Sequence, residues 1–242
     1  MAQSYFIWNN VDCRAKGVTL AGPVPIVRPE ERVKHVQIPG ISGDLTQLEG
    51  ENIFNSYIQT ANIQVAGGMR VREIYDWLRG SGYVTFHGEP DRRQAARIIG
   101  AITLNRFSRN IDRWTGSVQF YCQPLKERLR NEIITVTSTQ TKVYNFGDVN
   151  AKPIWRVTAD NSSSFSLMVL GTGTYPSPIT VECYEDHVYM IDSEVMEIMD
   201  ETNGQHATLY SSGPFPFVAP GGNMIIGSGW SRVEIEMRER FL

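Results

Sequence analysis

The sequence predicts a mainly β protein, all-β with one short helix and divided into two domains. Only one segment has convincing helical periodicity, and it spans residues 69–80. Most other apolar segments alternate with a period of two, and turn residues separate them at the spacing of a β-sandwich or jelly roll. We therefore expect an N-terminal domain at 1–126, sandwich-like with a helix and a projecting β-hairpin, and a C-terminal β-sandwich at 127–242.

The predicted helix has one apolar face, formed by Val71, Ile74, Tyr75 and Leu78 at the i, i+3, i+4, i+7 spacing. Gly80 follows the last of these residues and can take the positive φ with which helices often end. Because a helix with one apolar face needs a second layer to cover it, we expect this helix to lie on a sheet.

Alternating segments on both sides of the helix supply that sheet. In order, they are 57–65, 83–87, 96–107 and 114–122. Gly100 interrupts the third segment, which predicts a bulge or a bend there. Earlier in the chain we expect a strand at 31–38, whereas 45–55 has only scattered apolar residues and is predicted as loop.

The third and fourth segments should form a long hairpin with a polar, basic tip. Arg106, Arg109, Asn110 and Arg113 lie at this tip. We expect them to contact a neighbouring subunit, since a projecting arm is a common device for assembly. The alternative is an ordinary solvated loop.

The apolar pattern lapses at 124–131, where charged residues gather, and this predicts the domain boundary. Every apolar segment beyond it is predicted as a strand: 133–137, 154–159, 165–170, 179–184, 188–191, 195–199, 224–226 and 232–237.

Composition excludes several classes of function. The 242-residue chain has 41% hydrophobic residues, enough for a real core, and a net charge of −3, which argues against nucleic-acid wrapping. We see no signal peptide and no apolar run long enough for a membrane helix, so we expect a soluble protein made in a cytoplasm. The three cysteines, Cys13, Cys122 and Cys183, are too scattered for a disulfide framework or a zinc site.

No motif for catalysis, cofactor binding or metal binding has the right context. Ser228 lies in Gly-Ser-Gly between two predicted strands, not at a strand-to-helix elbow, and the four histidines are widely spread. Eight carboxylates crowd the second domain: Glu182, Glu185, Asp186, Asp192, Glu194, Glu197, Asp200 and Glu201. Paired carboxylates could serve a glycosidase, but charges on solvent faces and hairpin tips explain the cluster more simply.

Three aromatic residues in the second domain are candidates for a partner or sugar contact. Phe215 and Phe217 lie in a proline-rich stretch that cannot be a central strand, so they either plug the sandwich or meet a partner. Trp230 could stack on a sugar, although a buried or interface role is more usual for tryptophan.

Short motifs, each of them mainly turn chemistry, resemble the distal tail (Dit) proteins of long-tailed phages when taken in order. In the first half they are Trp8-Asn9-Asn10, Ile38-Pro39-Gly40 with Gly43, the helix with Trp77-Leu78, and Phe120-Tyr121-Cys122-Gln123-Pro124. In the second half they are Asn145-Phe146-Gly147 with Pro153-Ile154, then Ile191-Asp192-Ser193-Glu194, then Phe215-Pro216 with Pro220-Gly221-Gly222-Asn223. The sequence departs from the family pattern at Ile41 and Ser42, where Arg and Asp are usual, and at the second glycine of the last motif.

The resemblance implies a structural virion protein and not an enzyme. Such proteins form a hexameric ring, a homo-oligomer that joins the tail tube to the tail tip or adsorption apparatus and leaves a central channel for DNA. Implied partners are the tail-tube protein, a tail-tip protein and receptor-binding proteins, without sequence-specific nucleic acid, membrane insertion or cofactor. The implied location is the tip of the virion tail, after assembly in the host cytoplasm, and the C-terminal domain is expected to be galectin-like.

Two alternatives stay open. A carbohydrate-binding module would need exposed aromatic residues in a groove of the second domain. A glycosidase would need two carboxylates facing one cleft, about 5 to 9 Å apart.

Overall fold

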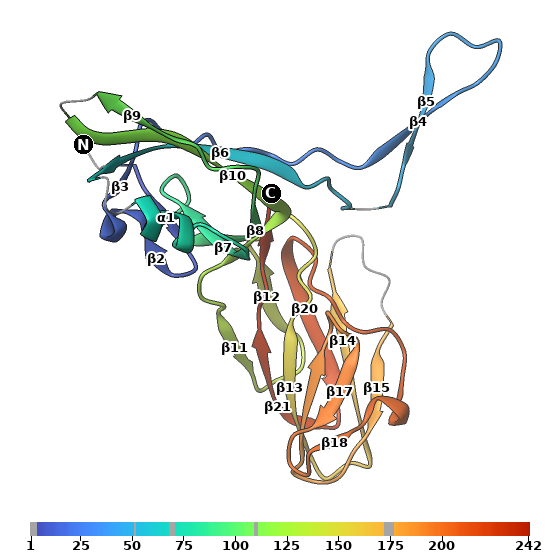
Figure 1. The fold of residues 1–242 in the computed structure, drawn as a ribbon. Coiled ribbons are helices and arrows are strands. Elements are labelled where there is room, and N and C mark those ends of the chain that lie inside the picture. The colour runs from blue at the N-terminus through green and yellow to red at the C-terminus, as the bar shows by residue number, and fades with distance from the viewer. Residues whose placement is uncertain (1–3, 51, 68–70, 109–110, 172–176) are drawn as a thin grey trace. The chain divides into compact units, whose positions relative to one another are not determined.

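A computed structural model describes residues 4–50, 52–67, 71–108, 111–171 and 177–242. The described chain is mainly β with one α-helix, as the sequence predicts (Figure 1). It forms two compact units, Met1–Leu129 with Leu242 and Arg130–Phe241. They are called unit 1 and unit 2 below.

Unit 1 is built on an antiparallel sheet whose longest strand is β10 (Ile111–Arg128). The strands run in the order β2-β1-β7-β8-β10-β6-β3, and β9 also pairs with β10. Their bounds are β1 Phe6–Trp8, β2 Val11–Asp12, β3 Val18–Leu20, β6 Tyr57–Ala66, β7 Ser81–Phe86, β8 Arg92–Ile99 and β9 Leu104–Ser108, and the 3-10 helix η1 is Cys13–Lys16. The long β10 pairs with β6 from Arg113 to Cys122 and with β8 from Gln119 onward, so it ties most of the sheet together.

Helix α1 (Val71–Trp77) packs on this sheet as expected, but its apolar face is narrower than predicted. Ile74 and Leu78 are buried, whereas Tyr75 is exposed, because a helix of two turns covers only a narrow strip. Residues 69–70 of the predicted helix lie outside the described residues. Beneath the helix, Phe6 stacks on Trp77 with ring centroids 5.7 Å apart.

The predicted bend at Gly100 is confirmed. Strand β8 ends at Ile99, Gly100 has φ +70°, and β9 begins at Leu104. The segment 96–107 is therefore two strands that share the partner β10, not one long strand.

The loop prediction for 45–55 is wrong in its first part. Strand β4 (Val33–Gln37) pairs with β5 (Asp44–Leu48), and these two strands form a separate two-stranded sheet. Figure 1 shows this hairpin, called the arm below, extending away from the sheet of unit 1. All five β5 residues are exposed, so the strand lacks the alternation of buried and exposed residues by which strands are recognised in sequence.

Unit 2 is a sandwich of two antiparallel sheets. One has the order β11-β21-β13-β16-β17-β18 and the other the order β12-β20-β14-β15-β19. The first contains β11 Ile133–Val136, β13 Ile154–Ala159, β16 Val188–Asp192, β17 Glu197–Asp200, β18 Gln205–His206 and β21 Trp230–Glu236. The second contains β12 Thr141–Asn145, β14 Ser164–Leu170, β15 Ile179–Glu182, β19 Ser211–Ser212 and β20 Gly221–Ser228. Two further elements belong to neither of these sheets: the 3-10 helix η3, Thr208–Tyr210, and the short strand β22, Arg240–Phe241.

The core of unit 2 lies between these sheets and includes Trp155, Phe165 and Tyr189. A buried hydrogen-bond chain connects it to the surrounding turns. The Trp155 indole N–H donates to Ser193 Oγ at 2.9 Å, and Ser193 Oγ donates to the Pro216 carbonyl at 2.6 Å. This chain fixes the turn after β16 to both β13 and the proline-rich segment.

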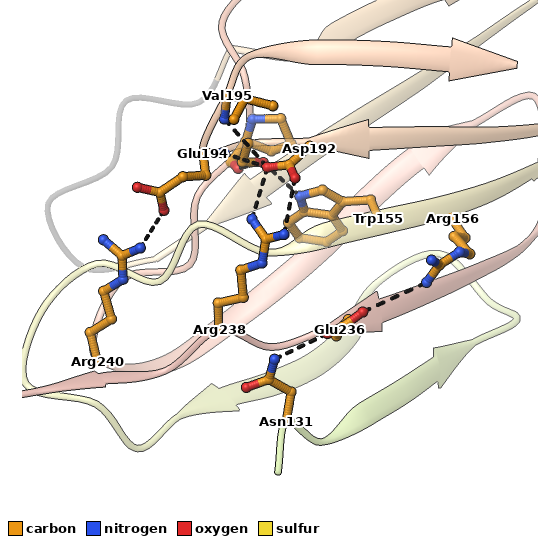
Figure 2. Close-up of polar contacts among 11 residues, drawn as sticks. Asn131, Trp155, Arg156, Asp192, Glu194, Val195, Glu236, Arg238 and Arg240 are labelled. Carbon is orange, nitrogen blue, oxygen red and sulfur yellow. Dashed lines mark hydrogen bonds and ion pairs between the residues drawn. The ribbon is translucent and has the colours of Figure 1, made fainter. Parts of the chain in front are cut away.

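An ion pair clamps the same turn to the end of the sandwich. Arg238 donates from both terminal nitrogens to Asp192, at 2.9 and 3.0 Å, and Asp192 Oδ1 also accepts the Glu194 N–H at 2.9 Å (Figure 2). Burial alone would raise the pKa of Asp192, but the Arg238 guanidinium and the backbone N–H groups outweigh it and lower the pKa. The charged carboxylate therefore stabilises the fold.

We expect the substitution R238M to destabilise unit 2 by about 1.5–3 kcal/mol at pH 7, because a partly buried carboxylate loses its bidentate partner. A folded-state pKa below the unfolded value stabilises the protein above the unfolded pKa, which is near 3.8 for an aspartate, and this contribution disappears as pH falls through the folded value. The difference between R238M and the parent chain should thus shrink below about pH 4.

Urea unfolding of both proteins at pH 7 and pH 3 measures this difference. The matched control is R156M, since Arg156 is more exposed and its carboxylate contacts are longer, at 3.3 and 3.8 Å. It should cost less than about 1 kcal/mol. Equal losses for the two variants at both pH values would contradict the clamp.

Candidate functional site

The predicted interface hairpin is present, but it is not a free arm. Arg106 in β9 is paired with Trp114 in β10, and on the other side of β10 Arg113 is paired with Ala66 in β6. The end of β10 therefore lies between two strands. Arg106 and Arg113 are exposed, while Arg109 and Asn110 lie outside the described residues. Their role in subunit contact stays a prediction.

The free-standing hairpin of unit 1 is the arm, which the sequence did not identify. Its register pairs Val33 with Leu48 and Val36 with Leu45. Because the two pairs are three residues apart, they lie on opposite faces of the ribbon. Leu45 is 55% exposed and Leu48 is 60% exposed, and Ile41 at the tip is exposed as well. The arm thus presents apolar side chains on both faces.

Such an arm is not stable by virtue of its own packing. A two-stranded hairpin in water is marginally stable at best, because it has no second layer to cover its apolar side chains. Backbone hydrogen bonds hold its base: the Arg32 N–H donates to the Ile53 carbonyl at 2.8 Å, and the Asn55 N–H donates to the Glu30 carbonyl at 2.8 Å. The remainder of the arm is suited to contact with another molecule.

The acidic residues of unit 2 act mostly as partners of basic side chains. Besides Asp192, four pair with arginine or histidine: Glu194 with Arg240, Glu201 with Arg156, Glu197 with His206, and Asp200 with His187. Asp200 is buried, and its second oxygen accepts the N–H groups of Thr202 and Asn203. These contacts favour a structural role for the cluster over the glycosidase alternative. Within the described ranges, no group of three or more His, Cys, Asp and Glu could hold a metal ion.

Of the three candidate aromatic contacts, Trp230 is buried, and the two phenylalanines are partly buried. Trp230 is only 8% exposed, and its indole N–H donates to the Ser166 carbonyl at 3.1 Å. Phe215 is partly buried against the core of unit 2, and Phe217 is also partly buried. Stacking of Trp230 on a sugar does not fit this position, because its ring is covered. Contact of the two phenylalanines with a partner stays a prediction.

Unit 2 instead exposes tyrosines beside a pocket that the sequence did not point to. The pocket has a volume of about 510 Å³ and lies at the edge formed by β15, β17 and β18. Tyr184 and Tyr210 are among its lining residues. A tyrosine next to a turn, as in Tyr184-Glu185-Asp186, is the only signal in the sequence that could have suggested it.

The three cysteines, which are too scattered in sequence for a disulfide framework, are free thiols in the structure. Cys13 and Cys122 are buried, and Cys183 is partly buried. Burial raises the pKa of Cys122 to about 12, so its thiol is protonated at neutral pH. In the part of the chain that the structure describes, no helix is long and apolar enough to cross a membrane.

Comparison with known proteins identifies the fold. No model of a protein family and no curated protein sequence matches the chain. Among solved structures, the chain is similar to the SPP1 Dit protein, described as a paradigm of the hub adsorption apparatus in phages that infect Gram-positive bacteria. The match has a TM-score of 0.80 at 17% sequence identity and covers 100% of both chains.

The match confirms the mainly β fold class and the resemblance carried by the ordered motifs. Since it spans both units, it is not a likeness between isolated sandwiches. The chain has the fold of a phage distal tail (Dit) protein.

Proposed function

We propose that this chain is a structural subunit of a phage tail. It assembles as a hexameric ring between the tail tube and the tail tip, and it leaves a central channel for DNA. The observation that carries this proposal is the fold match to a hub protein over the full length of both chains. Unit 1 builds the ring, and the galectin-like unit 2 carries contacts to other parts of the tip.

The arm supports this proposal because it supplies the kind of contact that a ring needs. A ring forms when one surface of a subunit binds a different surface of the next and the rotation closes. An arm with uncovered apolar side chains on both faces fits such a head-to-tail contact. We therefore assign to the arm the subunit-embracing role that the sequence suggested for the β9–β10 hairpin, with Arg106, Arg109, Asn110 and Arg113 as a secondary contact.

The charge of the chain supports a passage for DNA that does not retain it. A channel lined by many basic residues would bind phosphates strongly. With 23 basic and 26 acidic residues, the chain has no overall excess of basic residues that would favour such a lining. The protein works by assembly and not by catalysis, with the tail-tube and tail-tip proteins as partners, at the virion tail tip after assembly in the host cytoplasm.

We expect the purified chain to form particles with six times the chain mass of 27.3 kDa and a central hole. Light scattering combined with negative-stain images measures both quantities. Some protein rings assemble only in the presence of a partner protein. The same measurement is therefore repeated with the tail-tube protein added. A monomer under both conditions would contradict the proposal.

The arm can be tested separately from the hairpin tip. We expect the double substitution of Leu45→Asp and Leu48→Asp to prevent assembly, because two leucine side chains lose contacts worth on the order of 3 kcal/mol. Charge reversal of Arg106, Arg109 and Arg113 to Glu should weaken assembly less. Sedimentation velocity reports assembly, and circular dichroism verifies that each variant is folded.

Leu209 provides the matched control for the arm, since it is an almost fully exposed leucine of unit 2. Leu209→Asp should assemble as the parent does. The assignment of the arm is wrong if the double variant assembles like this control, and the assignment of the hairpin tip is wrong if the triple charge reversal does.

A further inference from the structure

The pocket of unit 2 lies at an edge where the two sheets of the sandwich end in very short strands. Edge strands β18 and β19 contain two residues each, and η3 connects them. The lining residues come from strands β14 to β18, from neighbouring turns and from η3, and they include Glu182, Tyr184, Asn203, Gln205 and Tyr210. Its volume of about 510 Å³ falls within the range of roughly 300–1,000 Å³ for small-molecule sites.

Two tyrosines on the lining are strongly exposed. Tyr184 is 69% exposed and Tyr210 is 61% exposed. Both belong to fixed backbone: the Tyr184 N–H donates to the Tyr189 hydroxyl at 3.0 Å, and the Tyr210 N–H donates to the Ala207 carbonyl at 3.0 Å. A large ring on a fixed segment binds with little loss of conformational entropy.

The inner wall of the pocket is polar and held in place by its own contacts. His187 Nδ1 lies 2.7 Å from Asp200 Oδ2, and Asp200 Oδ1 accepts two backbone N–H groups of the following turn. The ring centroid of Tyr184 lies 5.4 Å from that of His187, so the exposed Tyr184 ring packs beside the His187–Asp200 pair. The geometry of the wall is therefore set before a ligand arrives.

The chemistry of the remaining lining residues selects a class of ligand. Glu182 is exposed and can accept hydrogen bonds from hydroxyl groups, while Asn203 and Gln205 carry amides that both donate and accept. Among the described residues that line the pocket there is no lysine and no arginine. Phosphates and other anions are thus disfavoured. An extended peptide is disfavoured as well, because edge strands of two residues offer little backbone for pairing.

We propose that this pocket binds a neutral saccharide. The C–H face of a pyranose ring is apolar and stacks on a tyrosine, whose ring face is negative and whose hydroxyl stays in water. The hydroxyl groups of the sugar pair with the carboxylate and the amides. This binding goes beyond the structural role and does not depend on ring assembly. Exposed aromatic residues beside a groove of the second domain are the feature that a carbohydrate-binding module requires, and Tyr184 and Tyr210 supply it where Trp230 does not.

The test uses the full chain on an array of oligosaccharides. The probes are oligomers of glucose, galactose and N-acetylglucosamine, with polyglycerol phosphate and polyuronate as anionic comparisons. We expect saturable binding to at least one neutral oligomer and none to the anionic ones. Binding to no neutral oligomer at millimolar concentration, or to the anionic probes alone, would overturn the proposal.

Titration calorimetry with the bound oligomer then locates the site. Tyr184→Ala and Tyr210→Ala should each raise Kd about tenfold or more, as truncation of an aromatic contact residue does. Tyr184→Phe keeps the ring and should retain most of the affinity. Tyr144→Ala is the matched control, since Tyr144 is an exposed tyrosine of the same unit outside this pocket. An unchanged Kd in both pocket variants, or a loss of affinity only in the control, would overturn the assignment. The sedimentation coefficient of every variant should equal that of the parent, because the pocket is not proposed to take part in assembly.

Discussion

Each apolar face of a β-sheet must be covered by a second layer, and the parts of this chain meet that requirement differently. Unit 2 meets it internally, because two sheets enclose one core around Trp155 and Phe165. In unit 1, helix α1 packs on the sheet through Ile74 and Leu78. The arm has no such cover, and both of its faces carry apolar side chains. Among the described residues, the arm is thus a sheet whose leucine side chains stay exposed.

Unit 2 not only covers its sheets internally but also fixes its turns through polar contacts. The Arg238–Asp192 pair and the Trp155–Ser193 chain fix the turn after β16. The carboxylate of Asp200 fixes the turn after β17, because it accepts the N–H groups of Thr202 and Asn203. The contacts of Asp200 also hold the polar side of the pocket in place beside Tyr184 and Tyr210. A site with fixed geometry suits the binding of a ligand.

The fold could be predicted from sequence wherever burial leaves a pattern. The segments 57–65, 154–159 and 232–237 are strands as predicted, since each has buried residues on at least one face. Strand β5 has no such pattern, because its residues are all exposed and only pairing with β4 makes it a strand. Strand β12 was missed for a related reason: Asn145 is one of its two most deeply buried residues and reads as a turn residue, yet its side chain bonds the Val149 and Val218 carbonyls.

The candidate sites were harder to predict, because exposure depends on contacts between distant residues. The sequence favours a buried or interface position for Trp230 but leaves a sugar contact open, and only the structure shows that its indole N–H donates to the Ser166 carbonyl of β14. Tyr184 and Tyr210 are 26 residues apart in sequence and share a pocket only because both sheets of the sandwich end at the same edge. Motif order, in contrast, pointed to the fold, since turn chemistry at fixed places in the chain reflects topology.

We propose that the arm joins one subunit to the next around a closed ring. The most direct test replaces Ile41, an exposed residue at the tip of the arm, with a photo-crosslinking amino acid. After irradiation of the assembled protein, denaturing gel electrophoresis counts the linked subunits. We expect a ladder of bands that ends at six, together with a linked peptide from unit 1 of a second chain. A gel with monomers alone, from a sample that light scattering shows to be assembled, would contradict it.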